Sequence, residues 1–304
     1  MGSKLRLSEK DIDVLMFLAK YKMMLGSDAK RIYKTKDYHR KRLKVLEKDK
    51  YIRRVNRLYI KLDDKGTKLV RNFGYEYSFL CRKKQYVDRV NEIARIAALT
   101  LNSKIEFVAS WSLKDNNIYT QTSRKYIGRL LYQGKKIIVY YVAKDKTFVY
   151  ISQIINDIQK AMEYDNVIIF VEDMNILKHY KKFAFGKKST VIVESTAHNL
   201  EIIRRLAEID EYQIIKQIYA NKEILLSNWK KANYMTEDKR YVFVMPFVDT
   251  ERLYKLNMFF KSNQGISKKI DIITLKDNKE EINRILTNKV NIIEMDKWLG
   301  GIDE

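Results

Sequence analysis

Residues 8–74 constrain the fold more than any other stretch, because three short helical patterns are followed directly by two short strand patterns. Ser8 is a suitable N-cap for the first helix. Apolar residues then recur at helical spacing, at Ile12, Leu15, Met16 and Ala19. Gly26 is expected to end that helix, Ser27 to cap a second one and Thr35 to cap a third.

Two short strands are expected after the third helix. They cover residues 51–55 and 57–62 and join at Asn56, a residue that suits a tight hairpin turn. A further short helix is expected over residues 65–73. Three helices followed by a basic hairpin are the arrangement of a winged helix-turn-helix, whose third helix enters the major groove of duplex DNA. We therefore predict such a domain over residues 1–75.

The third helix is expected to have an inward and an outward side. Leu43 and Leu46 should pack on the first two helices, with His39 on the inward or lateral side. The expected base contacts come from Asp37, Tyr38, Arg40, Lys41 and Lys44. The expected phosphate or minor-groove contacts come from Arg42, Arg53, Arg54 and Arg57.

Positive charge is concentrated in the same region. Residues 1–72 contain 22 Lys and Arg against 9 Asp and Glu, a net charge of +13 out of +22 for the whole chain. This clustering favours double-stranded DNA as the partner. Two alternatives stay open, because charged runs also solvate ordinary surfaces and winged helices also dock proteins, for example in a replication or transfer complex.

The chain from residue 76 to residue 304 is expected to form a second, larger α/β domain. An amphipathic helix is expected over residues 83–101. Strands are then predicted at 105–111, 127–133, 136–143, 166–173, 189–195, 241–247 and, as the last one, 269–275. Helices are predicted at 147–164, 174–183 and 251–260, with a long helical stretch from His198 towards Trp229. This alternation indicates a central mixed sheet flanked by helices, which gives an overall α+β or α/β fold class. The domain is expected to serve as a dimerisation, second DNA or partner-binding surface.

The sequence offers little for a metal or a cofactor. His39, His179 and His198 are far apart, and a single Cys81 excludes an internal disulfide framework and a cysteine-rich zinc site. No glycine-rich loop opens a helix after a strand, so no cofactor is predicted. No apolar run approaches the roughly 18 residues of a membrane span. We expect a soluble cytoplasmic protein with no membrane partner.

The hairpin over residues 127–143, followed by a helix, is similar to the core of restriction-endonuclease-like folds. Those enzymes hold Mg²⁺ with carboxylates on the hairpin strands. Here the two strands offer Gly128 and Arg129, then Tyr140 and Tyr141, so we predict a non-catalytic scaffold. A metal-dependent nuclease or nicking enzyme stays open as the alternative. Packing is the favoured role of the two tyrosines over a nucleophilic one. The strand-end acids Glu172, Asp173 and Glu194 are expected to cap helices.

Taken together, a winged helix followed by a nuclease-like α/β domain resembles the replication-relaxation family of plasmids and other mobile elements of Gram-positive bacteria. The resemblance rests on LSEKDIDVLMFLAKY, RLKVLEKDKYIRRV, KLDDKGTKLV and YIGRLLYQGKKIIVYYVAK. It implies a role in plasmid replication or transfer. The expected function is sequence-specific binding of duplex DNA in a bacterial mobile element, with replication initiation, transfer or transcriptional control as the output.

Overall fold

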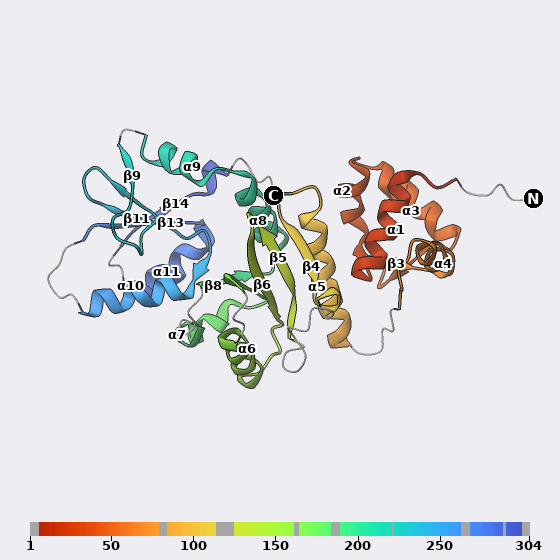
Figure 1. Ribbon diagram of the computed structural model, residues 1–304, viewed down its shortest axis with the longest axis horizontal. Coiled ribbons are helices and arrows are strands. Elements are labelled where there is room, and N and C mark those ends of the chain that lie inside the picture. Colours follow the sequence, from red (N-terminus) through yellow and green to blue (C-terminus); the bar gives the residue numbers. More distant parts are fainter. Residues whose placement is uncertain are drawn as a thin grey trace, which may run out of the picture. The chain divides into compact units, whose positions relative to one another are not determined.

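The computed structural model describes residues 6–78, 84–113, 125–160, 164–183, 189–220, 222–262, 268–287 and 290–299. The chain has a mixed α+β fold, with three sheets among these residues, and it divides into two compact units, Met1–Ile118 and Tyr119–Glu304 (Figure 1). Cys81 lies outside the described residues.

The described part of the first unit contains the five helices that the sequence predicted, together with a small antiparallel sheet. Its elements are α1 (Glu9–Tyr21), β1 (Met24–Leu25), the 3-10 turn η1 (Gly26–Asp28), α2 (Ala29–Tyr33), α3 (Tyr38–Lys48), β2 (Ile52–Val55), β3 (Tyr59–Leu62), α4 (Asp64–Asn72), α5 (Lys84–Thr100), β4 (Glu106–Ala109) and the 3-10 turn η2 (Ser110–Ser112). The sheet has the order β1–β3–β2, so β3 is central and pairs with both neighbours.

The start of α1 is confirmed and two other boundaries are corrected. Ser8 forms a capping box, in which its side chain accepts from the Asp11 N–H while the Asp11 side chain accepts from the Ser8 N–H. Helix α3 begins at Tyr38 rather than after Thr35, and its N-cap residue makes no side-chain capping bond. Helix α1 ends at Tyr21, before Gly26, because the intervening residues form β1, which the sequence reading missed.

Gly26 has a different role from the expected helix stop. Its N–H donates to the carbonyl of Leu58 at 2.9 Å, and a Cβ at this position would lie 3.3 Å from that same oxygen. Glycine therefore permits the close approach of η1 to the tip of the β2–β3 hairpin.

A buried carboxylate joins the first three helices. Asp11 on α1 is fully buried and accepts from the Tyr33 hydroxyl on α2 at 2.6 Å. Arg42 on α3 donates hydrogen bonds to both oxygens of the same carboxylate, with Nε 2.8 Å from Oδ1 and Nη2 2.6 Å from Oδ2. Burial by itself raises the pKa of Asp11, but the hydrogen bonds from Arg42, Tyr33 and Ser8 outweigh it and hold that pKa below its ordinary value. This bidentate pair fixes the position of α3 on the other two helices.

Later segments of the first unit fasten the C-terminal end of α1. The Tyr77 hydroxyl donates to the carbonyl of Lys22 at 3.0 Å, and Trp111 Nε1 donates to the carbonyl of Lys20 at 2.9 Å. These bonds satisfy carbonyls that a helix end leaves without partners. The Tyr21 hydroxyl donates to the carbonyl of Phe107 on β4.

Helix α5 adds an apolar contact, since Val90 and Ala94 pack with Met23 in one buried cluster. These contacts extend the first compact unit to Ile118, whereas we expected a domain boundary between residues 75 and 76.

The second unit contains two sheets rather than the one central sheet that we predicted. Its elements are β5 (Tyr126–Tyr132), β6 (Lys135–Val142), α6 (Phe148–Lys160), β7 (Asn166–Val171), the 3-10 helix η4 (Met174–His179), α7 (Tyr180–Phe183), β8 (Ser189–Glu194), α8 (Ala197–Glu208), α9 (Glu211–Ile218), β9 (Ile224–Leu226), β10 (Tyr234–Thr236), β11 (Tyr241–Val244), β12 (Val248–Asp249), α10 (Thr250–Ser262), β13 (Ile270–Thr274), η5 (Lys276–Asn278), α11 (Lys279–Leu286), β14 (Asn291–Glu294) and η6 (Asp296–Trp298).

Both sheets of the second unit mix parallel and antiparallel strands. In the larger one, the strands of this unit follow the order β12–β8–β7–β6–β5, with β6, β7 and β8 parallel. The other has the order β14–β13–β11–β10–β9, with β11, β13 and β14 parallel. The expected helical stretch from His198 towards Trp229 was wrong beyond residue 218, because strand β9 follows α8 and α9. Strand β14 also follows the strand that we expected to be the last.

Buried carboxylates organise the second unit as well. Asp271 on β13 is 1% exposed and accepts from the Tyr219 hydroxyl at 2.6 Å and from Arg240 Nη1 at 2.8 Å. Asp249 accepts from the Ser189 hydroxyl and from two backbone N–H groups at the start of α10. A carboxylate that leaves water needs hydrogen-bond donors. Ser189 and Tyr219, which supply such donors to Asp249 and Asp271, are distant from them in sequence, so each carboxylate joins two separate segments.

Within the described ranges, no helix has both the length and the apolar composition needed to cross a lipid bilayer.

We predict that Arg42→Met lowers the free energy of unfolding of the first unit by about 3 kcal/mol, because it leaves the buried Asp11 carboxylate without its cation. Arg40→Met is the matched control, since the Arg40 side chain on the same helix is 77% exposed. Urea denaturation gives the stability, and hydrogen exchange of peptides from α3 localises the loss. Equal stability of the two variants would contradict the assigned role of Arg42.

The stability that Asp11 provides should depend on pH. Because its pKa is lower in the folded than in the unfolded chain, this contribution is present above the unfolded value of about 3.9 and is lost as the pH falls below it. The difference in unfolding free energy between the wild type and Asp11→Asn should therefore shrink as the pH is lowered from about 5 to about 3. Parallel stability curves over this range would show that the carboxylate charge is unimportant.

Candidate nucleic-acid interface

Helix α3 has one buried side, as the sequence predicted. His39, Leu43 and Leu46 are 2%, 2% and 0% exposed, and their spacing of four and three residues puts them on one side of the helix. Together with the Asp11–Arg42 pair, this side determines which residues of α3 face outward.

Four candidate residues lie on the exposed part of α3. Tyr38, Arg40, Lys41 and Lys44 are all exposed, and Tyr38 lies edge-on against the Tyr33 ring at 6.1 Å between centroids. Arg40 Nη1 lies 3.9 Å from Asp37 Oδ1, a distance at the limit of an ion pair, and both side chains are mostly exposed. Such a pair contributes little stability, so Asp37 and Arg40 can change partners at small cost.

Arg42 does not share this exposed position. Its side chain is 15% exposed, its guanidinium is bound to Asp11, and Nη2 also donates to the carbonyl of Arg6 at 2.8 Å. We expected a phosphate contact at this residue. The structure gives Arg42 an internal partner instead, because a guanidinium fork fits a buried carboxylate at both oxygens. We do not retain it among the proposed contacts.

The three hairpin arginines differ in their partners. Arg53 is 58% exposed at the side chain and lies 4.0 Å from Asp63. Arg54 Nε lies 3.1 Å from Glu47 Oε2 on α3, and Nη1 donates to the carbonyl of Arg57 at 3.2 Å. Arg54 therefore links the hairpin to α3. Arg53 and Arg57 present their charge to solvent.

The hairpin turn contains backbone strain. Asn56 and Arg57 both have positive φ, 48° and 61°, between strands whose last paired residues are Val55 and Tyr59. Asn tolerates this left-handed region, but Arg rarely adopts it. Leu58, the next residue, is 63% exposed. The turn thus holds a cation and an apolar side chain outward at its tip.

Sequence reasoning missed three residues of this surface. Lys34 and Lys36 are exposed in the turn between α2 and α3, close in sequence to the N-terminal end of α3. The run KTK before the third helix was the signal, because phosphate groups favour helix N-termini. Leu58 was part of a predicted strand, and its exposure follows from the turn geometry.

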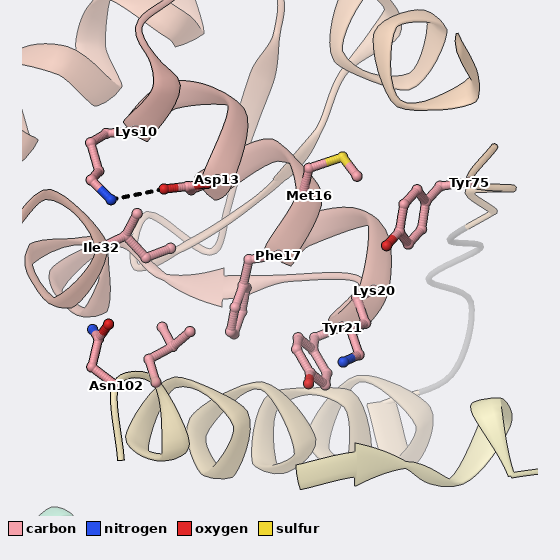
Figure 2. Close-up of a pocket in the computed structure, with 10 residues that line it drawn as sticks. Lys10, Asp13, Met16, Phe17, Lys20, Tyr21, Ile32, Tyr75 and Asn102 are labelled. Atoms are coloured by element: carbon pink, nitrogen blue, oxygen red, sulfur yellow. Dashed lines mark hydrogen bonds and ion pairs between the residues drawn. The ribbon is translucent and has the colours of Figure 1, made fainter. Parts of the chain in front are cut away.

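A cavity of about 310 Å³ also lies within the first unit, against α1 (Figure 2). Its lining includes the apolar side chains of Phe17 and Ile32, while Lys10 and Asp13 lie close together at one end, with Nζ and Oδ2 2.9 Å apart. None of the nine candidate contact residues lines it. Because Lys10 is paired with Asp13, this end of the cavity offers no clear attraction for a phosphate.

The tyrosines in the hairpin of the second unit are buried. Tyr140 and Tyr141 are 1% and 9% exposed, so the predicted packing role is confirmed, and the Tyr141 hydroxyl donates to Glu172. Glu172 also accepts from the backbone N–H of Lys144, and Asp173 accepts from that of Asn175 at the start of η4. Among the residues that the structure describes, no three His, Cys, Asp or Glu side chains form a group that could hold a metal ion.

We predict that Arg57→Gly keeps the hairpin and raises the unfolding free energy of the first unit by up to about 1 kcal/mol, because glycine adopts positive φ without steric cost. Urea denaturation measures the change, and Arg53→Gly, within strand β2, is the control that should destabilise. A loss of stability in Arg57→Gly would mean that its side chain contributes a contact that outweighs the strain.

No protein-family model matches the chain, and neither a curated protein nor a solved structure is significantly similar to it, so the proposals below rest on its residues and their geometry.

Proposed function

We propose that the first unit contains a winged helix-turn-helix that binds double-stranded DNA in a sequence-specific manner. The observation that carries this proposal is the exposed basic side of α3, which lies opposite the side occupied by His39, Leu43 and Leu46. A helix that is fixed on one side and cationic on the other suits insertion into a major groove.

The outward residues of α3 have the chemistry of base and phosphate recognition. The Arg40 guanidinium can donate to both acceptors of a guanine, and the Asp37 carboxylate can accept from a cytosine amino group. Lys41 and Lys44 lie one turn apart and supply charge for guanine or phosphate oxygens. The exposed Tyr38 ring adds an apolar surface with a hydroxyl at its edge.

The hairpin would act as the wing. Arg53 and Arg57 supply phosphate or minor-groove contacts, and Lys34 and Lys36 add phosphate contacts near the start of α3. Leu58 at the tip offers an apolar contact to a sugar. Arg54 holds the hairpin against α3 through Glu47, so it positions these groups in addition to carrying charge.

The second unit would position the winged helix-turn-helix on DNA, either through dimerisation or by binding a partner. Replication initiation, transfer or transcriptional control of a plasmid or other mobile element is the biological role that we propose. The resemblance of the sequence to the replication-relaxation family motivates that part of the proposal.

The test compares two double variants of the full-length protein. Lys41→Ala with Lys44→Ala removes two charges from α3, and Lys68→Ala with Arg71→Ala removes two from the exposed side of α4. With a duplex recovered from source DNA by selection on the wild type, the α3 variant should bind about tenfold or more weakly. The slope of log affinity against log salt should become shallower by about 1.8 if both lysines contact phosphates. The α4 variant should bind as the wild type does.

Two results would change the assignment. Equal binding by the α3 variant and the wild type would move the function towards a protein-docking domain. Metal-dependent nicking of supercoiled plasmid by the purified protein, with Mg²⁺ or Mn²⁺, would show an enzyme that the winged helix delivers to its site.

A further inference from the structure

The second unit has a cavity of about 270 Å³ beside the ends of β6 and β7. The cavity is lined by the last residue of β6, by the start of α6 and by η4. Strands β6 and β7 are parallel, so their carboxyl ends lie at the same sheet edge. Such edges are where open α/β sheets bind ligands, because the loops leave a crevice there.

The lining combines apolar side chains with charged ones, and cations outnumber acids among the charged residues. Lys144, Lys146 and Lys178 line the cavity with His179, against a single lining acid, Asp173. Asp173 accepts a hydrogen bond from the backbone N–H of Asn175. This bond lowers the pKa of the Asp173 carboxyl, and the charges of Lys144 and Lys178 lower it further. Lys146 also lies 3.7 Å from Asp145, which does not line the cavity. Helix α6 also begins at this cavity, and the N-terminal end of a helix favours anions.

An aromatic surface lies beside these charges. Phe148, the first residue of α6, is 44% exposed and lies 4.9 Å from the His179 ring between centroids. Val149 next to it is 64% exposed. An exposed aromatic ring beside lysines is the combination that proteins use for single-stranded nucleic acids, because the base stacks while the cations meet the phosphate.

We propose that this cavity binds a nucleotide, with its phosphate near Lys144 and Lys178 and its base against Phe148. The nucleotide comes either from single-stranded DNA or from the free pool, and the two sources share this chemistry. This site is separate from the proposed duplex-binding surface, because it lies in the other compact unit and uses none of the α3 or hairpin residues.

The experiment measures fluorescence anisotropy of a short labelled oligothymidylate with the full-length protein. Lys144→Ala with Lys178→Ala should weaken binding about tenfold and reduce the salt slope by about 1.4, the value for two phosphate contacts on a single strand. Phe148→Ala should also weaken binding by removing the stacking surface. Asp173→Asn should strengthen it, since the amide keeps the turn-forming acceptor and loses the repelling charge.

Two variants serve as controls. Lys135→Ala with Lys160→Ala removes two exposed lysines at the opposite ends of β6 and α6, so it matches the charge change within the same unit. It should leave binding unchanged. Lys41→Ala with Lys44→Ala should affect duplex binding and spare the oligothymidylate, so that this inference and the proposed duplex binding can fail separately.

Competition with unlabelled dTMP distinguishes the sources. Unlabelled oligothymidylate is the reference competitor, with its concentration counted per nucleotide. If dTMP displaces the label at similar concentrations, the result supports a free nucleotide as the ligand. If dTMP displaces it much more weakly, the result supports single-stranded DNA. Undetectable binding of both probes to the wild type would overturn the proposal. Equal weakening by the cavity pair and the control pair would overturn it too, since it would reduce the effect to net charge.

Discussion

The buried pair of Asp11 and Arg42 is the interaction on which the candidate DNA-binding surface depends. It connects the first turn of α1 to α3, and the hydroxyl of Tyr33 adds α2 to the same carboxylate. A carboxylate without exposure to water is costly unless charged and hydrogen-bonded partners surround it, which makes the arrangement of the three helices specific. The pair therefore determines which side of α3 faces outward, towards DNA or another partner.

Three acidic residues of the first unit lie against arginines of α3 or of the hairpin. Asp11 binds Arg42, Glu47 binds Arg54, and Asp63 lies near Arg53. The lysines of α3 lie on the surface outside these pairs. Lys41 and Lys44 therefore keep their charge at the exposed side of α3. The strained turn at Arg57 adds to this surface, and its φ of 61° is the kind of local cost that functional sites often carry.

The second unit differs from the first in how it could recognise an anion. Buried carboxylates such as Asp271 link segments around one of its sheets, and the cavity that Lys144, Lys146 and Lys178 line lies at the carboxyl edge of parallel strands of the other. The hairpin of β5 and β6 contributes two buried tyrosines, Tyr140 and Tyr141, to the core of this unit. The cations at this edge, Lys144, Lys146 and Lys178, are the groups on which the proposed phosphate contact depends.

The sequence by itself determined the positions of most helices and strands, because their apolar residues follow periods of 3.6 and 2 that need no tertiary information. It also determined the buried side of α3 and the exposure of Lys41 and Lys44. Only the tertiary structure decided the partner of Arg42, since nothing local links residues 11 and 42. The same holds for β1, β9, β10 and β14, which are too short or too weakly patterned to recognise alone and depend on strands that lie elsewhere in the chain. The division of the second unit into two sheets, and the lysine-lined cavity at one of them, likewise follow from pairings between distant segments.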